Sequence, residues 1–201
     1  MKLTWKNGAT LCLKFDNLTV LVNPTEYGGE APDAVIVTAY ADNCFSRDAL
    51  TRYAEDGARL LLCREAYAEL SECDTAVLLA PHSVWSERGV TFYAVKAETA
   101  SRTAIGIIAD DADKTYYVAG PTLYNFDVID DCLDLAPDGV DLAVLPISGK
   151  KCTMNARDAA DFAYEIGAKC AVPVDYSEPD TASLFDFDDA VIINCGDARE
   201  F

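Results

Sequence analysis

The chain has 201 residues, of which 51% are hydrophobic and 25% are charged. This balance predicts a folded core and excludes global disorder, and the length suits one domain or two closely packed halves. The formal net charge is −18. Nucleic acid and anionic membrane are therefore not expected as partners, because both attract surfaces rich in lysine and arginine.

Cysteine usage and the N-terminus indicate the compartment. Residues 1–15 are interrupted by Lys6, Gly8 and Lys14, so they lack the continuous apolar segment of a secretory signal. The chain has eight cysteines, none in a C-x-x-C pair. Apolar runs contain Cys12, Cys63, Cys170 and Cys195. This pattern is typical of buried free thiols in a reducing environment, and the expected location is the cytoplasm.

The first third of the chain predicts a β-meander followed by a strand, a loop and a helix. Alternating or apolar runs predict strands at residues 2–6, 9–15 and 18–23, and a Gly-rich loop follows at 25–31. Residues 34–37 form a buried strand. Ser46 is the expected N-cap of a helix that extends to about Tyr53. The intervening loop, residues 39–44, follows the carboxyl end of a strand, which is a common position for an active site.

The remaining elements alternate between strand and helix patterns. A helix is expected at residues 156–166. Asn155 and Asp158 have the spacing of a capping box at its start, and Gly167 is its expected end. The only histidine, His82, lies in an expected loop at residues 81–89. Strands are expected at 58–63, 75–80, 90–97, 103–109, 115–118, 141–146, 170–174 and 190–194, and helices at 64–72 and 156–166.

The stretch PDAVIVTAYADNCFSRDAL resembles the metal-binding core of the metallo-β-lactamase-fold hydrolases, where a strand ends in Thr and H-x-H-x-D-H precedes a helix. In this sequence Ala39 and Ala41 stand at the first two histidines, Asn43 at the aspartate and Cys44 at the last histidine. A frame moved by one residue places Asp42 at the aspartate, but it misaligns the flanks and supplies no histidine.

Other motifs of the resembled family occur in the same order with their functional residues replaced. Gly8 stands at the histidine of G-H-A, and Asn23-Pro24 stands at a D-P pair. Thr99 stands near the position of a further histidine of that family, and Asp175 stands at the position of its final histidine. Pro121 stands where the family's G-D-T motif has its metal-bridging aspartate. The resemblance spans nearly the whole chain and is greatest to the small lactonase-like bacterial branch. It implies an α+β fold, a four-layer αββα sandwich of two mixed sheets with helices outside, in a single domain over residues 1–201.

The replacements predict that the zinc of the resembled family is absent. A catalytic zinc takes about three protein ligands from His, Cys, Asp or Glu, and at the matched positions only Cys44 and Asp175 carry such groups. We therefore expect a catalytically degenerate protein, a pseudoenzyme without cofactor, with a binding, regulatory or scaffolding role. Its partner would be a small molecule or a protein, and a homo-oligomer is compatible with the sequence.

Two alternatives stay open. One is a metal-dependent hydrolase of lactones, phosphoesters or similar small substrates, using a hard ion held by Asp42, Cys44 and Asp175 with Asp110 or Asp111. The other is a ligand pocket in the room left by small residues, weighed against a site filled by side chains such as Tyr40. We expect His82 to be a surface residue and Cys44 to be a passive thiol, because no histidine near it in sequence could act as its base.

Overall fold

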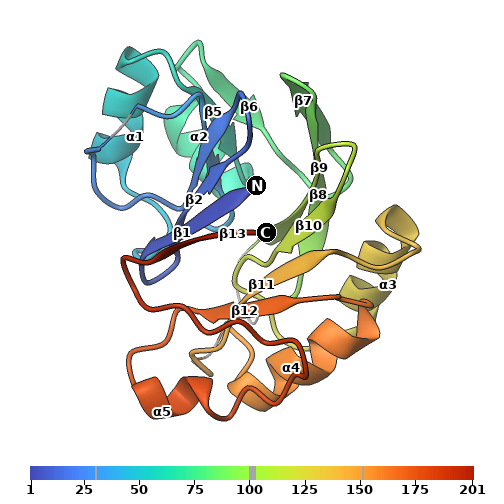
Figure 1. The fold of residues 1–201 in the computed structure, drawn as a ribbon. Helices are drawn as coiled ribbons and strands as arrows, with labels where there is room; N and C mark the ends of the chain where they lie inside the picture. Colours follow the sequence, from blue (N-terminus) through green and yellow to red (C-terminus); the bar gives the residue numbers. More distant parts are fainter. Residues whose placement is uncertain (30, 100–102, 151) are drawn as a thin grey trace. The chain divides into compact units, whose positions relative to one another are not determined.

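The computed structural model describes residues 1–29, 31–99, 103–150 and 152–201. The chain divides into two compact units, Met1–Ala80 with Asn194–Phe201, and Pro81–Ile193 (Figure 1). Each unit carries its own β-sheet; the expectation of one domain over residues 1–201 stays a prediction. In the described ranges, no helix combines the length and the apolar character needed to cross a membrane.

The first unit is built on a mixed sheet, whose order in the described residues is β13-β1-β2-β3-β4-β5-β6. Its strands are β1 (Lys2–Asn7), β2 (Thr10–Lys14), β3 (Thr19–Val22), β4 (Ala34–Val37), β5 (Arg59–Leu62), β6 (Ala76–Leu78) and β13 (Ala198–Glu200). β1 to β3 pair antiparallel, and β3 to β6 run parallel. Every residue of β4 is buried, as expected of a continuous apolar run in a parallel strand.

Two helices follow parallel strands of this sheet, α1 (Arg47–Glu55) after β4 and α2 (Arg64–Leu70) after β5. The expected N-cap of α1 is confirmed, because the Ser46 hydroxyl accepts a hydrogen bond from the backbone N–H of Ala49. The Arg47 guanidinium lies 3.3 Å from Glu69 and 2.6 Å from Glu72. These exposed ion pairs each contribute about 0–1 kcal/mol, so the helices owe their stability mainly to their buried apolar faces.

The second unit carries a mixed sheet with the order β12-β11-β10-β9-β8-β7 in the residues described. Its strands are β7 (Val84–Glu87), β8 (Val90–Ala97), β9 (Ala104–Asp110), β10 (Thr115–Val118), β11 (Leu142–Pro146) and β12 (Ala171–Val174). β7 to β10 pair antiparallel, whereas β10, β11 and β12 run parallel. Its helices are α3 (Phe126–Leu135), α4 (Ala156–Glu165) and α5 (Pro179–Ala182).

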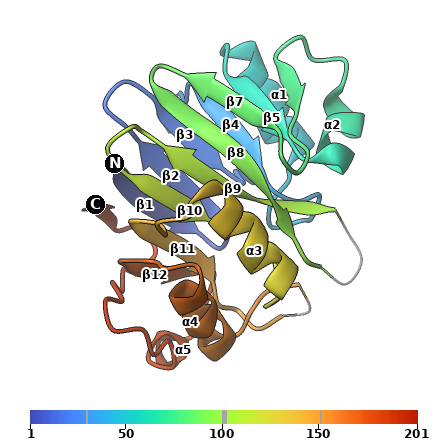
Figure 2. The ribbon, with the colours of Figure 1, turned by 90° about the vertical axis from the view of Figure 1, so that its right-hand side faces the viewer.

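The core of the second unit lies between its sheet and two helices. Figure 2 shows α3 and α4 against one face of the sheet. The apolar face expected for α4 is confirmed, because Ala160, Phe162, Ala163 and Ile166 are all buried. Phe162 stacks on Tyr117 of β10 with ring centroids 5.7 Å apart. Burying a side chain of this size contributes about 1.5–3 kcal/mol, so this pair fixes α4 on the sheet.

Three elements of the second unit were not predicted from the sequence. β7 lies inside the expected loop at residues 81–89, and it turns into β8 at Arg88 and Gly89, whose φ values are 48° and 86°. β7 is an edge strand with little burial, so no apolar alternation reveals it. The helices α3 and α5 were not predicted. α3 does have a start signal, because the Asn125 side chain accepts a hydrogen bond from the backbone N–H of Asp127 at 2.7 Å.

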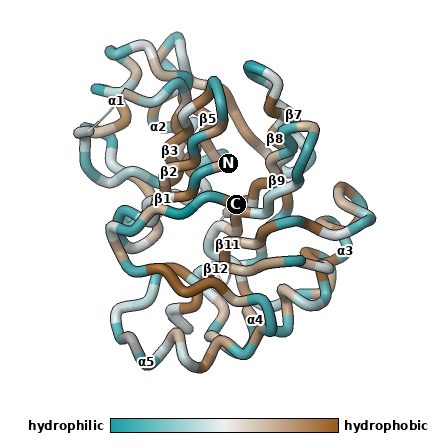
Figure 3. The backbone as a smooth tube through the Cα atoms, in the orientation of Figure 1, coloured by the Kyte–Doolittle hydropathy of each residue, from teal (hydrophilic) through white to brown (hydrophobic). Residues whose placement is uncertain are grey.

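The expectation of a closing strand at residues 190–194 is wrong. Figure 3 shows a hydrophobic stretch beside β12, where the backbone N–H of Val191 donates to the Ala171 carbonyl at 2.8 Å. This contact remains an isolated bridge between Ala171 and Ala190. The last strand is β13, which pairs with β1. β13 is fully exposed, so its polar sequence carries no strand pattern.

The cysteines only partly follow expectation. All eight are free. Cys63 is buried as its apolar run predicts, Cys12 and Cys170 are half-buried, and Cys195 is exposed. Expected burial is therefore confirmed for Cys63 and wrong for Cys195, whose thiol contacts the Lys6 carbonyl at 2.9 Å.

Candidate functional site

The parallel strands of the first unit bring three loops to one edge of its sheet. β3, β4 and β5 are parallel, so the segments that follow them leave at their shared carboxyl edge. Ligands of α/β sheets commonly bind at this edge. The loop at residues 39–44 is one of the three, as the sequence analysis expected.

Asn23 holds the ends of β3 and β4 together. Its Oδ1 accepts hydrogen bonds from the backbone N–H of Thr38 at 2.8 Å and from the Thr38 hydroxyl at 3.0 Å. The Thr10 hydroxyl donates to the Asn23 carbonyl at 2.8 Å. Asn23 and Thr38 are 3% and 0% exposed. The polar group that replaces the resembled aspartate is therefore engaged inside the unit.

The turn between β4 and α1 offers few donor groups. The backbone N–H of Cys44 donates to the Ala41 carbonyl at 2.8 Å. Ala39 and Cys44 are buried, Ala41 is half-buried and Asn43 is exposed. The Cys44 sulfur lies 3.6 Å from Oδ1 of Asn43. A fully buried thiol does not suit a reactive cysteine, which favours the passive role expected of Cys44.

The other residues named for the first unit differ in exposure and in contacts. Asp42 is exposed, in contrast to the buried Cys44. Gly8 occupies the turn between β1 and β2 with a φ of 40°, and its carbonyl accepts a hydrogen bond from the Trp5 indole at 2.8 Å. Tyr40 packs on Phe45 with ring centroids 4.7 Å apart.

A second carboxyl edge belongs to β10, β11 and β12, which are parallel in the second unit. Pro121 follows β10 at this edge and is half-buried; its ring offers no metal-binding atom. The next residue, Thr122, is buried, and its hydroxyl accepts a hydrogen bond from the backbone N–H of Glu98 at 3.0 Å. Thr99 follows β8 and is half-buried.

Asp175 follows β12 at this edge with a φ of 55°, in the left-handed region that aspartate tolerates better than most residues. The Ser148 hydroxyl donates to Oδ2 of Asp175 at 3.3 Å and lies 2.6 Å from the Thr153 hydroxyl. Burial raises the pKa of Asp175, opposed by the charge of Lys150 and by the bond from Ser148. The carboxylate is thus held in a small hydroxyl cluster. Ser148 also lines a groove of about 780 Å³ with the start of α4.

Replacing Asp175 with asparagine is expected to raise the thermal midpoint slightly at pH 7. Because the folded pKa is raised, the folded state binds the Asp175 proton more tightly than the unfolded chain does. The ionised carboxylate therefore destabilises the fold at neutral pH, and this penalty fades as the pH falls through the ordinary aspartate pKa of about 3.9. Asparagine tolerates the same backbone conformation. Melting curves from pH 3 to 8 check this; a gain that does not shrink toward low pH would contradict it.

Two residues named for the hydrolase alternative cannot bind the same ion as Asp175. Asp110 and Asp111 lie in the hairpin before β10, where the Tyr116 hydroxyl donates to Asp111 at 2.9 Å. Asp175 follows the end of β12, and β10 and β12 both run parallel to β11. The hairpin and Asp175 are therefore at opposite edges of one sheet and cannot share an ion.

His82 is exposed, as expected, with 59% of its side chain accessible. The structure adds a contact that the sequence did not predict: Nδ1 of His82 lies 3.5 Å from Oδ1 of the buried Asp131. The same carboxylate accepts a hydrogen bond from the backbone N–H of Lys96 at 2.8 Å. The histidine thus joins its segment to α3 within the second unit.

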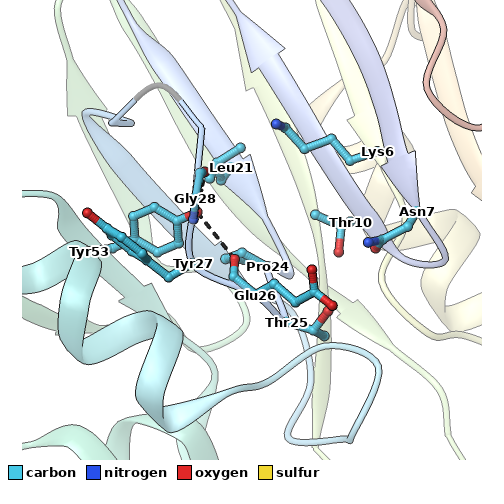
Figure 4. Close-up of a pocket in the computed structure, with 10 residues that line it drawn as sticks. All are labelled: Lys6, Asn7, Thr10, Leu21, Pro24, Thr25, Glu26, Tyr27, Gly28 and Tyr53. Atoms are coloured by element: carbon cyan, nitrogen blue, oxygen red, sulfur yellow. Dashed lines mark hydrogen bonds between the residues drawn. The ribbon is translucent and has the colours of Figure 1, made fainter.

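Figure 4 shows a pocket at the carboxyl edge of the first unit, with a volume of about 150 Å³. The residues around it are Lys6, Asn7, Thr10, Leu21, Pro24, Thr25, Glu26, Tyr27, Gly28 and Tyr53. Gly8, Ala39 and Ala41 are not among them, so the alternative of a ligand pocket at the small replaced residues stays a prediction. The Gly-rich pattern after β3 predicted a loop here, but it could not indicate which side chains meet beside it.

The donor groups do not fit the zinc of the resembled family. At the matched positions the first unit supplies one buried thiol, and the second supplies one carboxylate that already accepts a bond from Ser148. The described part of the chain contains no group of three or more His, Cys, Asp or Glu side chains placed to hold a metal ion. A catalytic zinc needs about three such ligands.

Comparison with known proteins identifies the fold. No protein-family model matches the chain, and no curated protein matches it. The metallo hydrolase Igni18 of the archaeon Ignicoccus hospitalis matches with a TM-score of 0.80 at 18% identity, over 100% of this chain and 98% of that chain. An isothiocyanate hydrolase from Delia radicum gut bacteria matches with a TM-score of 0.76 at 16% identity, over 100% and 99%. YhfI of Bacillus subtilis, a metallo-β-lactamase fold protein, matches with a TM-score of 0.75 at 16% identity, over 99% of each chain.

The chain has the metallo-β-lactamase fold. The expected resemblance is thereby confirmed, as is the α+β class with two mixed β-sheets and helices. Structural neighbours of this fold include metal-dependent hydrolases. At these identities the likeness concerns the fold, and the reactions in those names belong to those proteins.

Proposed function

We propose that this chain is a catalytically degenerate metallo-β-lactamase-fold protein that binds no zinc at the positions its fold relatives use and acts by binding. The supporting observation is the chemistry at the strand ends. Ala39, Ala41 and Pro121 have no side-chain donor atom, and Asn43 offers only a neutral amide. One lost ligand can be replaced by a neighbour, but simultaneous loss at both carboxyl edges removes the basis for a hydrolytic ion.

The role we propose is binding, regulation or scaffolding, with a small molecule or a protein as partner. The polar groups at the ends of β3 and β12 support a role without metal chemistry, because they are engaged within the protein. Asn23 pairs with Thr38, and Asp175 accepts a bond from Ser148. Such hydrogen bonds stabilise the ends of the strands.

Elemental analysis tests the proposal. The untagged protein, expressed with added zinc and manganese, is expected to contain less than about 0.1 equivalent of either metal, because a functional centre binds tightly through several ligands. Igni18, a metallo hydrolase of the same fold, purified in parallel, serves as the loading control. It should retain its metal under identical conditions.

A stoichiometric metal in this chain would overturn the proposal and favour a metal-dependent hydrolase. The Asp175→Ala and Cys44→Ala variants would then be analysed for metal content, together with Asp42→Ala. Loss of metal in these variants, with turnover of a lactone or phosphoester by the parent protein, would establish the non-standard acidic and thiol site.

A further inference from the structure

The pocket in Figure 4 has a rigid aromatic wall. Tyr27 and Tyr53 pack with ring centroids 5.0 Å apart, and the Arg52 guanidinium lies 3.8 Å from the centroid of the Tyr27 ring. The Tyr27 hydroxyl donates to Asp56 at 2.7 Å, and this bond raises the pKa of Tyr27. Both rings are therefore held in place before any ligand arrives.

The loop after β3 is fastened to that wall. The Tyr53 hydroxyl bonds to the Gly28 carbonyl at 3.0 Å and accepts the Gly28 backbone N–H at 3.1 Å. It also lies 3.3 Å from the Glu26 carbonyl. Tyr53 itself is only 2% exposed. One buried side chain thus fixes the backbone on both sides of Tyr27, so the pocket is preorganised, and preorganisation reduces the entropic cost of binding.

Two opposite charges border this pocket. Figure 4 shows the Lys6 ammonium and the Glu26 carboxylate on different sides of it, with Thr10 between their ends. Neither side chain forms an ion pair with another described residue. Lys6 reaches over the loop, since its Nζ would lie 3.6 Å from a Cβ added at Gly29. In a chain with net charge −18, an ammonium and a carboxylate that border one pocket, neither in an ion pair among the described residues, form a specific charge pattern.

We propose that this pocket binds a small zwitterion, a compact α-amino acid of the size of glycine or alanine. Lys6 receives the carboxylate and Glu26 receives the ammonium, while Leu21 and Pro24 supply an apolar surface for a small side chain. A volume of about 150 Å³ holds roughly five waters at about 30 Å³ each. The inference rests on the proposed binding role and names the chemistry of its ligand.

Other ligand classes fit this charge pattern poorly. Glu26 repels a phosphate or a dicarboxylate, and a single exposed lysine does not offset two negative charges. A metal cation would meet one carboxylate and one ammonium, far from the several oxygen ligands that hard ions take. Only a molecule that carries both charges on a short skeleton satisfies both sides of the pocket.

Titration with glycine and L-alanine, followed by backbone amide chemical shifts, tests the inference. We expect binding in the millimolar range, with the largest shifts at the Thr10 and Gly28 amides. Acetate and methylamine, which each carry one of the two charges, should bind at least about fivefold more weakly. Lys6→Met and Glu26→Gln should each weaken glycine binding by at least about fivefold. Lys2→Met, which removes an exposed lysine at the other end of β1, should leave it unchanged.

Absence of saturable glycine or alanine binding at tens of millimolar would overturn the inference, as would equal binding by the Lys6→Met, Glu26→Gln and parent proteins. Acetate binding as tightly as glycine would also overturn it and indicate a simple anion site. The two proposals fail separately. Stoichiometric metal with intact glycine binding removes the proposed function alone, and a metal-free protein that ignores both amino acids removes this inference alone.

Discussion

Replacing Gly139 with alanine is expected to destabilise the protein by about 3–5 kcal/mol. Gly139 precedes β11 with a φ of 80°, and an added Cβ would lie 2.2 Å from the carbonyl oxygen of Gly167. Gly167 ends α4 with a φ of 63°, so the two turns cross through backbone atoms alone. The backbone must move to relieve the clash, and movement here separates α4 from the sheet. Urea unfolding followed by far-ultraviolet circular dichroism measures the loss.

The matched control is Gly89→Ala in the β7–β8 turn. Gly89 has a φ of 86°, but an added Cβ meets no atom within 4 Å. This variant therefore pays only the left-handed backbone penalty of about 1–2 kcal/mol. Equal losses at Gly139 and Gly89 would show that the close approach of the two turns carries no energetic weight, and the account of their packing would be wrong.

Replacing Asn23 with alanine is expected to cost about 3 kcal/mol, from an unsatisfied buried donor and from the strained backbone together. The Thr38 backbone N–H would lose its acceptor in a position that is 0% exposed. Alanine would also have to adopt a φ of 51°, which asparagine tolerates better. The thermal midpoint should fall by about 6–12 °C for a chain of this size, measured by calorimetry.

Two further variants separate the contributions at this strand end. Thr38→Val keeps the bond from its backbone N–H to Asn23 but removes the hydroxyl that pairs with the Asn23 amide at 2.9 Å, so about 1–2 kcal/mol is expected. Asn7→Ala removes an exposed amide and should change stability by less than about 0.5 kcal/mol. An Asn23→Ala protein as stable as Asn7→Ala would contradict the structural role of the pair.

The Asn23→Ala substitution bears on the proposed function. Asn23 stands where the resembled D-P pair has its aspartate. If Asn23 is needed for stability, its role is structural and does not involve a metal. If the Asn23→Ala protein stays folded, amino-acid binding in the adjacent pocket can be measured in it. We expect weaker binding, because the loop that begins at Pro24 and carries Glu26 would lose its anchor at the end of β3.

Part of this site was predictable because it depends on local sequence. The run Ala34–Val37 and the cap Ser46 predicted β4 and α1, since burial and capping are encoded within a few residues. The identities at the matched positions, such as Ala41 and Pro121, predict the loss of zinc ligands, and elemental analysis is needed to test it. The resemblance predicted the fold through the order of its motifs.

Other features depended on tertiary contacts that no local pattern encodes. Edge strands such as β7 and β13 are exposed and take their structure from pairing with β8 and β1, so their sequences lack alternation. The same holds for the pocket: Lys6 and Glu26 belong to separate segments and meet the same cavity only because β1, β2 and β3 are neighbours. By itself, the sequence determined buried strands such as β4 and the N-cap of α1, because each is a property of residues near one another in the chain. The loss of the metal ligands stays a prediction. Only the tertiary structure decided which polar groups pair and which charges face a pocket, because those depend on distances between segments far apart in sequence.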